Sequence, residues 1–161
     1  MSVKGTNFQV TLTIKREDTN ELVYYKQDGT RFDNENTIKM KVQTPYIFLL
    51  TIRPAQKIKV ASMKGDQLKR SSEEITVEYS NYCFHWKSTD IPVTKKNRRL
   101  SFNLILEIDG VGVLELPLQM KFYEATDTGH SKWGKSLHHV EFECMHKGGN
   151  SFVDILKTIY R

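Results

Sequence analysis

Hydrophobic and polar residues alternate along much of the chain, with the period of two that is typical of strands with one buried face. In residues 8–15, for example, apolar side chains occupy every second position. The same pattern predicts strands at 22–26, 38–42, 45–54, 57–62, 74–79, 82–87, 100–108, 114–122 and 139–145. Asp109-Gly110 lies between two of the strongest patterns and predicts a hairpin connection there. Short, regularly spaced strands indicate an all-β antiparallel barrel or sandwich of about nine to ten strands.

One segment near the C-terminus follows a different period. Apolar residues with helical spacing predict an amphipathic helix over about 151–160, and they are Phe152, Ile155, Leu156, Ile159 and Tyr160. Ser151 and Asp154 have the spacing of a helix N-terminal capping box. We therefore expect a short C-terminal helix that covers a barrel end or a sheet edge.

Composition agrees with the strand pattern. The chain has 11 Val, 11 Ile, 14 Thr and 17 aromatic residues but only 3 Ala, which favours sheet over helix. A length of 161 residues predicts a single domain over 1–161. The two cysteines are too few for a disulfide-stapled secreted scaffold. We find no signal-peptide pattern and no apolar run that approaches a membrane span, so we expect a cytoplasmic protein.

The net charge of +5 is unevenly distributed. Residues 53–70 carry a local charge of +5 and residues 87–99 a local charge of +4, which leaves the rest at −4. If the two stretches meet in space, they form a basic patch suited to anionic lipid, acidic peptide or phosphorylated peptide. Neither stretch contains an aromatic residue for base stacking, so nucleic acid is not an expected partner.

Candidate catalytic residues are sparse. Cys83 lies two residues from His85, and Cys144 lies near the late histidines His130, His138, His139 and His146. However, the sequence has no CxxC pair, no HExxH helix, no phosphate-binding glycine loop and no nucleophile elbow. We therefore predict a protein that is not an enzyme and that has no metal or cofactor.

Two blocks of sequence resemble a known family. The first runs from Val23 to Phe32 (VYYKQDGTRF) and continues in Thr37-Ile38-Lys39, and the second comprises Gln119–Tyr123, Trp133-Gly134 and Val140–Cys144. In this order and at these separations, the blocks resemble the cannabinoid receptor-interacting protein family, from about residue 8 to about residue 144. The resemblance implies a cytosolic, non-enzymatic β-barrel, similar to lipid-chaperone barrels of the Rho GDP-dissociation inhibitor kind. It also implies binding to the C-terminal tail of the type 1 cannabinoid receptor and modulation of its G-protein coupling.

Basic residues of the matching blocks and of the second basic stretch are the predicted contacts for the receptor tail, or for anionic lipid of the inner leaflet of the plasma membrane. Arginine binds carboxylate and phosphate bidentately, and lysine binds them as a point charge. The predicted residues are Lys26, Arg31, Lys121, Lys95, Lys96, Arg98 and Arg99. The tail is expected to occupy an exposed sheet edge by strand addition. Among the aromatic residues of the blocks, Phe32, Phe122, Trp133 and Phe142 are expected to fill the interior.

An alternative function follows from the same resemblance. A barrel of the lipid-chaperone kind can carry the acyl or prenyl chain of lipidated cargo between its sheets. Such a carrier requires an apolar cavity, and Phe48, Leu104 and Met120 are its predicted lining residues.

Overall fold

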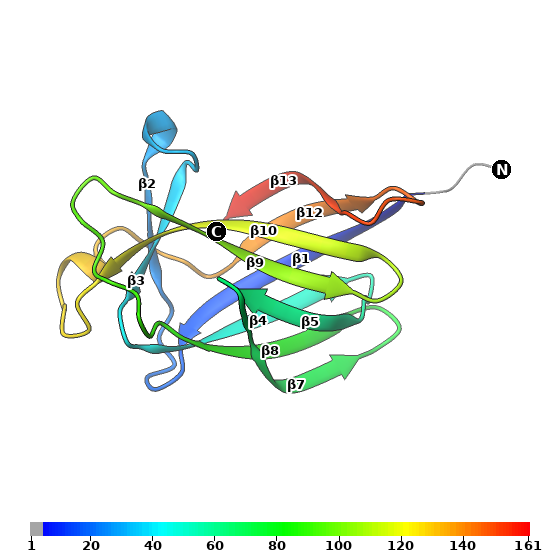
Figure 1. Cartoon of the computed structure of the whole chain (residues 1–161), viewed down its shortest axis with the longest axis horizontal. Coiled ribbons are helices and arrows are strands. Elements are labelled where there is room, and N and C mark those ends of the chain that lie inside the picture. Colours follow the sequence, from blue (N-terminus) through cyan, green and yellow to red (C-terminus); the bar gives the residue numbers. More distant parts are fainter. Residues whose placement is uncertain (1–4) are drawn as a thin grey trace.

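The computed structural model describes residues 5–161, which form two facing β-sheets (Figure 1). The first sheet has six strands in the order β13-β12-β1-β4-β8-β7. Their bounds are Asp154–Tyr160 (β13), Val140–His146 (β12), Thr6–Arg16 (β1), Pro45–Arg53 (β4), Ser80–Lys87 (β8) and Lys69–Ile75 (β7). All neighbours in this sheet are antiparallel. Most of the predicted strands of this sheet are confirmed, but residues 76–79 lie outside β7.

The second sheet has seven strands in the order β11-β2-β3-β10-β9-β5-β6. Their bounds are Lys135–Ser136 (β11), Tyr24–Gln27 (β2), Asn36–Lys41 (β3), Gly112–Tyr123 (β10), Leu100–Ile108 (β9), Ile58–Met63 (β5) and Asp66–Gln67 (β6). Strands β3 and β10 are parallel neighbours, whereas the other pairs are antiparallel. The two sheets keep separate hydrogen-bond ladders, so the described chain is a sandwich and not a closed barrel.

The buried faces of the two sheets form the hydrophobic core. Alternate residues of β1 are buried from Phe8 to Ile14, as the period of two predicts. In the predicted hairpin of β9 and β10, Leu106 lies opposite Leu114 and both are fully buried. At one end of the core, the centre of the Trp86 ring lies 6.0–6.4 Å from the ring centres of Tyr46, Phe48, Phe102 and Phe122. The buried side chains of both sheets form one cluster. The single domain over residues 1–161 stays a prediction.

The predicted C-terminal helix is wrong. Residues Asp154–Tyr160 are strand β13, which pairs antiparallel with β12 and forms an edge of the first sheet. The apolar residues of this segment do not make one buried stripe, because Phe152 and Leu156 are exposed while Ile155, Ile159 and Tyr160 are partly buried. Pairing with β12 satisfies the backbone groups that the two strands turn toward each other, and this long-range gain outweighs the local helical spacing.

The remaining helical structure of the described residues consists of two short 3₁₀ segments, η1 (Gly29–Arg31) and η2 (His130–Lys132). The Asp28-Gly29 pair therefore begins a longer connection between β2 and β3, with Gly29 at a φ of 65°. Across residues 5–161, none of the helical segments has the length and apolar character needed to cross a membrane.

Candidate functional site: a basic pocket

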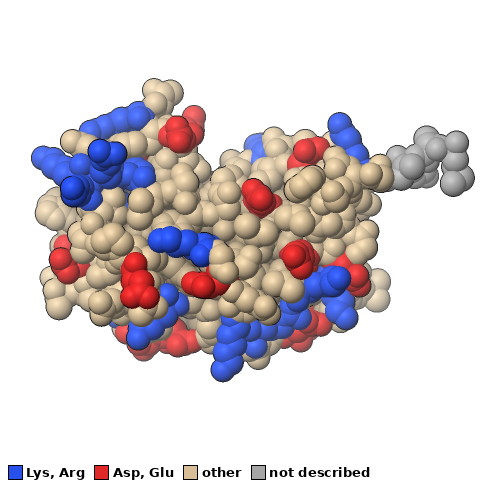
Figure 2. Space-filling model, viewed as in Figure 1, with Lys and Arg blue, Asp and Glu red and all other residues tan. Residues whose placement is uncertain are grey.

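An open pocket of about 490 Å³ lies where β2, β3 and β10 meet the β8–β9 connection and η2. Basic and aromatic side chains dominate its lining, which comprises Lys26, Thr37, Lys39, Lys96, Arg99, Lys121, Tyr123, His130 and Trp133. None of these lining residues is acidic. Figure 2 shows Lys and Arg side chains gathered at the end of the molecule where Figure 1 places β2 and the β8–β9 connection.

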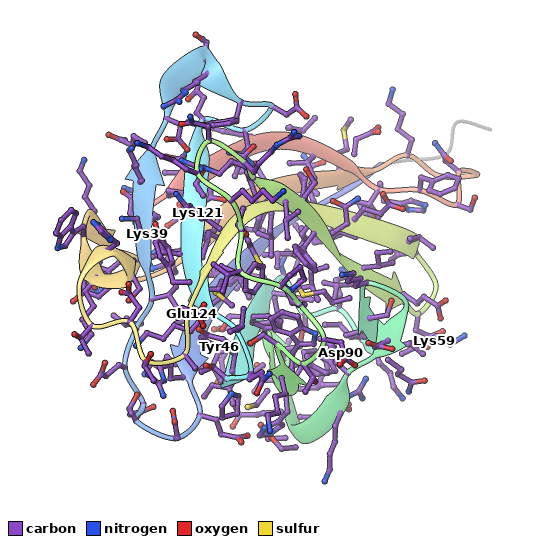
Figure 3. All side chains as sticks on the ribbon, turned by 60° about the vertical axis from the view of Figure 1, so that its left-hand side comes forward. Lys39, Tyr46, Lys59, Asp90, Lys121 and Glu124 are labelled. Carbon is purple, nitrogen blue, oxygen red and sulfur yellow. The ribbon has the colours of Figure 1, made fainter. Side chains whose placement is uncertain are left out.

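The register of the second sheet brings the lysines together. Lys39 of β3 is the direct cross-strand partner of Lys121 of β10, and Lys26 of β2 is the partner of Thr37, two residues before Lys39. Because residues two apart on a strand point to the same face, these three lysines share one side of the sheet. Figure 3 shows the labelled side chains of Lys39 and Lys121 on the same side of the molecule. Like charges in directly opposite positions destabilise a sheet, so this pair needs compensation.

Lys39 is the most buried of the lining lysines, with 8% of its surface exposed. Its Nζ donates a hydrogen bond of 2.9 Å to the carbonyl oxygen of His130 and lies 5.8 Å from the Tyr123 ring centre. Burial, followed by repulsion from Lys26 and Lys121, lowers the pKa of Lys39 below its usual range. The pKa of Lys121 is also lowered, by burial and then by repulsion from Arg99 and Lys26.

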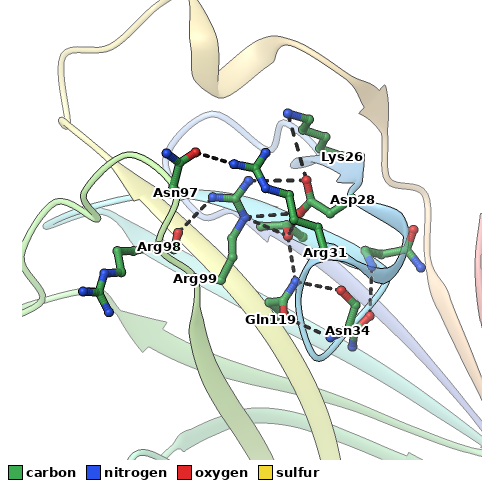
Figure 4. Close-up of polar contacts among 10 residues, drawn as sticks. Lys26, Asp28, Arg31, Asn34, Asn97, Arg98, Arg99 and Gln119 are labelled. Atoms are coloured by element: carbon green, nitrogen blue, oxygen red, sulfur yellow. Dashed lines mark hydrogen bonds and ion pairs between the residues drawn. The ribbon is translucent and has the colours of Figure 1, made fainter.

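Arg99 is held by a buried carboxylate beneath the pocket (Figure 4). Its Nε donates to Oδ2 of Asp28 at 3.2 Å, and its guanidinium carbon lies 4.4 Å from the Phe32 ring centre. The Thr37 hydroxyl also donates to Asp28 Oδ2. Burial acts to raise the pKa of Asp28, but the hydrogen bonds from Thr37 and Arg99 outweigh it and hold that pKa below its usual range.

Gln119 connects this ion pair to the β2–β3 connection. Its Nε2 donates to Thr37 Oγ1 and to the carbonyl oxygen of Asn34, each at 2.9 Å, and its Oε1 accepts from the Asn34 N–H at 3.0 Å (Figure 4). Gln119 is 3% exposed. A buried amide that satisfies both its donor and its acceptor in this way fixes the connection in place beside the pocket.

An aromatic side chain stands at the mouth of the pocket. Trp133 is 60% exposed, and its ring packs edge-on against the His130 ring at 4.1 Å. The prediction that Trp133 fills the interior is therefore wrong, because η2 and the short strand β11 carry this residue to the surface. Next to it, Gly134 has a φ of 113°, and a Cβ there would lie 2.5 Å from the carbonyl oxygen of Tyr25. Glycine thus permits the close approach of β11 to β2.

Comparison with known proteins identifies the family of this chain. The family model described as "CB1 cannabinoid receptor-interacting protein 1" matches residues 4–160. The chain belongs to the CB1 cannabinoid receptor-interacting protein 1 family. It is 24% identical to the human and the bovine CB1 cannabinoid receptor-interacting protein 1 over 139 residues. In both comparisons the match covers 84% of this chain and 85% of the relative.

In this member of the CB1 cannabinoid receptor-interacting protein 1 family, the structure brings together four of the predicted contact residues, namely Lys26, Lys96, Arg99 and Lys121. Arg31 lies beside the pocket and donates to Oδ1 of Asn97 at 2.6 Å. Lys95 and Arg98 are exposed on the same connection but do not line the pocket. Whether any of these residues contacts a partner stays a prediction.

Among the lining lysines, Lys39 is the one that the sequence did not reveal as part of the site, and Thr37, Tyr123, His130 and Trp133 were also not predicted as contact residues. It belongs to the matching string Thr37-Ile38-Lys39, but its position in an alternating strand is that of an ordinary solvated lysine. Only the parallel pairing of β3 with β10 places it opposite Lys121, and β3 and β10 are about eighty residues apart. A lysine at the end of the matching string was the one available signal.

The two basic stretches do not line a common pocket. Residues 87–99 contribute Lys96 and Arg99 to the basic pocket, and residues 53–70 contribute none of its lining. Instead, Lys59 and Arg70 belong to a separate depression on β5 and β7, where Arg70 is ion-paired with Glu73. In the basic pocket, residues 87–99 lie next to lysines of β2, β3 and β10 that are far apart in sequence.

The residues predicted to line a lipid cavity lie in the core. Phe48, Leu104 and Met120 are each 0% exposed and belong to the cluster of buried hydrophobic residues. None of them lines a pocket described for residues 5–161. Phe122 and Phe142 are also fully buried, as expected, whereas Phe32 is only partly buried and lies under Arg99. A lipid-binding role for the interior stays a prediction.

Cys144 and the late histidines do not form a reactive cluster. Cys144 is 2% exposed, and burial raises its pKa to about 12. His139 contacts Glu141 at 3.0 Å, and His146 contacts the carbonyl oxygen of Asn150 at 2.6 Å. Within residues 5–161, no group of three or more histidine, cysteine or acidic side chains is placed to hold a metal ion.

Cys83 and His85 do approach each other, with Sγ and Nε2 4.0 Å apart. The Nδ1 of His85 contacts a carboxylate oxygen of Glu17, a residue too distant in sequence to be recognised as an orienting acid. The three groups lie in a row at the surface of the first sheet, and Cys83 lines none of the pockets described for residues 5–161. The row therefore has no described concave site for a substrate.

Proposed function

We propose that this protein is a cytoplasmic, non-enzymatic adaptor that binds the C-terminal tail of a cannabinoid-type G-protein-coupled receptor and modulates its signalling. The observation that carries the proposal is the basic pocket of Lys26, Lys39, Lys96 and Lys121 in a member of this receptor-interacting family. Relatives at 24% identity are named for their interaction with the CB1 receptor. A peptide tail with acidic or phosphorylated groups is complementary in charge to such a pocket.

The edge of the second sheet next to the pocket supports a mode of binding. Strand β11 pairs only with Tyr24 and Tyr25, so within residues 5–161 the outer edge of β2 has no strand partner at Lys26 and Gln27. An extended tail added at this edge would gain backbone hydrogen bonds to β2 while its side chains reach the lysines. The aromatic surface of Trp133 lies beside the same edge and offers an apolar contact.

The proposal predicts weak, salt-sensitive binding to a synthetic peptide of the C-terminal tail of the type 1 cannabinoid receptor. Isothermal titration at low and at physiological ionic strength should give weaker binding as salt rises, because exposed charges are screened. The double variant Lys26→Ala, Lys121→Ala should bind about tenfold more weakly, because solvent-accessible charge pairs contribute about 0.2–1 kcal/mol each and a total of about 1.4 kcal/mol is tenfold in affinity. Lys59→Ala, which removes one positive charge, is the control for position, because Lys59 is exposed and lies across the molecule from Lys121 (Figure 3).

Two results would contradict the adaptor. The first is the absence of binding to the tail peptide at low ionic strength. The second is equal loss of binding in the double variant and in Lys59→Ala, which would mean that any reduction of positive charge weakens binding.

Peripheral association with the inner face of the plasma membrane is part of the same proposal. It predicts that the protein sediments with vesicles that carry the receptor tail more than with bare vesicles.

A further inference from the structure

The described chain compensates the charges of the basic pocket only in part. Lys26, Lys39, Lys96, Lys121 and Arg99 converge on it, and the lining contains no carboxylate. The carboxylate directly beneath it, Asp28, already accepts hydrogen bonds from Arg99 and Thr37, lies 4.0 Å from Lys26 Nζ, and has a side chain that is only 1% exposed. One buried anion against five cations leaves a strong local excess of positive charge. An anionic ligand would relieve this repulsion.

Lys39 has hydrogen-bond donors that the described chain leaves unused. An ammonium group has three N–H donors, and the carbonyl oxygen of His130 is the acceptor found for it within residues 5–161. Lys39 is more than nine-tenths buried, so water compensates for the unused donors only in part. Its cross-strand partner Lys121 stands in the same pocket. The sheet thus holds two ammonium groups side by side in a concave site, at a cost to its own stability.

We propose that this pocket binds the phosphate group of a phosphoserine or phosphothreonine residue in the partner's tail. This inference rests on the proposed function and names the chemical group that the site recognises. A phosphomonoester carries a charge between −1.5 and −2 near neutral pH and has three acceptor oxygens, whereas a carboxylate carries −1 and has two. Lysine binds phosphate as a point charge, and several lysines around one phosphate share its oxygens.

The surroundings of the pocket favour a peptide over a membrane surface. Acidic side chains interrupt the basic surface, because Asp33 and Glu35 are exposed on the β2–β3 connection and Glu124 is exposed directly after β10. A flat anionic membrane would be repelled by these groups, whereas a single phosphate enters the concave site between them. The exposed ring of Trp133 at the mouth provides a contact for a neighbouring residue of a peptide.

The test uses the peptide acetyl-Gly-Gly-phosphoserine-Gly-Gly-amide and its unphosphorylated serine form. Binding is followed by isothermal titration and by the fluorescence of Trp133, with the buried Trp86 as a constant background. The phosphorylated peptide should bind with one-to-one stoichiometry, and inorganic phosphate should compete with it. Lys39→Met should weaken binding roughly tenfold, the effect of losing one charge-assisted hydrogen bond of about 1.5 kcal/mol. Lys59→Met, with the same change of charge across the molecule, should change affinity less than about twofold.

A second variant tests the site even if the substitution of the buried Lys39 prevents folding. Lys96 is exposed on a connection, so Lys96→Met should fold normally and still weaken binding of the phosphorylated peptide. Equal binding of the phosphorylated and unphosphorylated peptides would overturn the inference. So would binding to phosphatidylcholine vesicles that contain phosphatidylinositol bisphosphate without binding to the phosphopeptide. If the receptor-tail peptide binds but the phosphopeptide does not, the phosphate site is contradicted and the proposed adaptor function is still supported. If the phosphopeptide binds but the receptor-tail peptide does not, the phosphate site is supported and the receptor tail is excluded as its partner.

Discussion

Arg99 and Asp28, which are 71 residues apart in sequence, form an ion pair in which Nε and Nη2 of the guanidinium donate to the two carboxylate oxygens at 3.2 and 3.4 Å. The side chains are only 7% and 1% exposed. Arg99 was predicted to contact a partner, yet its hydrogen bonds connect the start of β9 to the β2–β3 connection. Its main role in the described structure is to hold the floor of the basic pocket.

Asp28→Asn should therefore destabilise the fold. Removing one member of a buried ion pair leaves the other charge uncompensated, which costs about 3 kcal/mol in the free energy of unfolding. Urea denaturation followed by circular dichroism measures this loss. Asp66→Asn is the matched control, because Asp66 is exposed on β6, and it should cost less than about 0.5 kcal/mol. Equal stability of Asp28→Asn and the unmodified protein would show that the ion pair contributes nothing.

The same ion pair predicts a dependence of stability on acid pH. The folded pKa of Asp28 lies below its ordinary value of 3.8, so folding releases protons from this group. Its contribution is fully present above pH 3.8 and is lost as the pH falls through the lower, folded pKa. The difference in unfolding free energy between the unmodified protein and Asp28→Asn should thus shrink as the pH falls from 5 to about 2. Asp18 and Asp127 also have lowered pKa values, but they are present in both proteins and cancel. A difference that stays constant with pH would contradict the prediction.

The alternating pattern predicted most of the sandwich because each strand buries one face. Burial of one face requires apolar and polar residues to alternate, and this alternation can be read from a short stretch of sequence. It failed at residues 151–160, where Ile155 and Ile159 satisfy a helical period. In the structure a register shift interrupts the alternation of β13, so that Ile155 lies opposite the buried Cys144 whereas Ile159 lies opposite Glu141. The choice between helix and strand depends on β12, because its edge would have no strand partner without this segment. This edge lies outside the segment itself. Pairing partners at long range are not visible in a local period.

The basic pocket was predictable in part for a similar reason. Lys26 and Lys121 stood out as basic residues in the matching blocks, and Lys96 and Arg99 stood out in a basic stretch. The position of Lys39 depends on the parallel pairing of β3 and β10, which a pattern that favours antiparallel hairpins does not predict. The role of Arg99 depends on its ion pair with Asp28, which is 71 residues away in sequence and which no local pattern predicts.

The two thiols should differ strongly in reactivity. Cys144 is buried and its pKa is raised to about 12, so almost no thiolate is present at pH 8. Cys83 is partly exposed and lies beside the imidazole of His85. A native-state reaction with Ellman's reagent should therefore release the equivalent of one thiol rapidly, and the second only when the protein unfolds. Cys83→Ser should abolish the fast phase, and Cys144→Ser should leave it intact. Fast reaction of both thiols in the native protein would contradict this assignment.

Tyr160 of β13 provides a test of the C-terminal strand. Its hydroxyl is buried without a hydrogen-bond partner among residues 5–161, and its ring lies 5.5 Å from the ring of Tyr25. Because an unsatisfied buried hydroxyl opposes folding, Tyr160→Phe should leave the free energy of unfolding unchanged or raise it by up to about 1 kcal/mol. Burial also raises the pKa of Tyr160, so the hydroxyl should resist ionisation at alkaline pH in the folded protein.

Tyr82→Phe is the matched comparison for Tyr160→Phe. The Tyr82 hydroxyl accepts from the Ile58 N–H at 3.0 Å and donates to the carbonyl oxygen of Gln56 at 3.1 Å. Its removal leaves a buried N–H without a partner, and we expect a loss of about 1–3 kcal/mol in urea denaturation. The same chemical change should thus have opposite or unequal effects at the two positions. A larger loss for Tyr160→Phe than for Tyr82→Phe would mean that β13 docks on the sandwich in a different register, with its hydroxyl hydrogen-bonded.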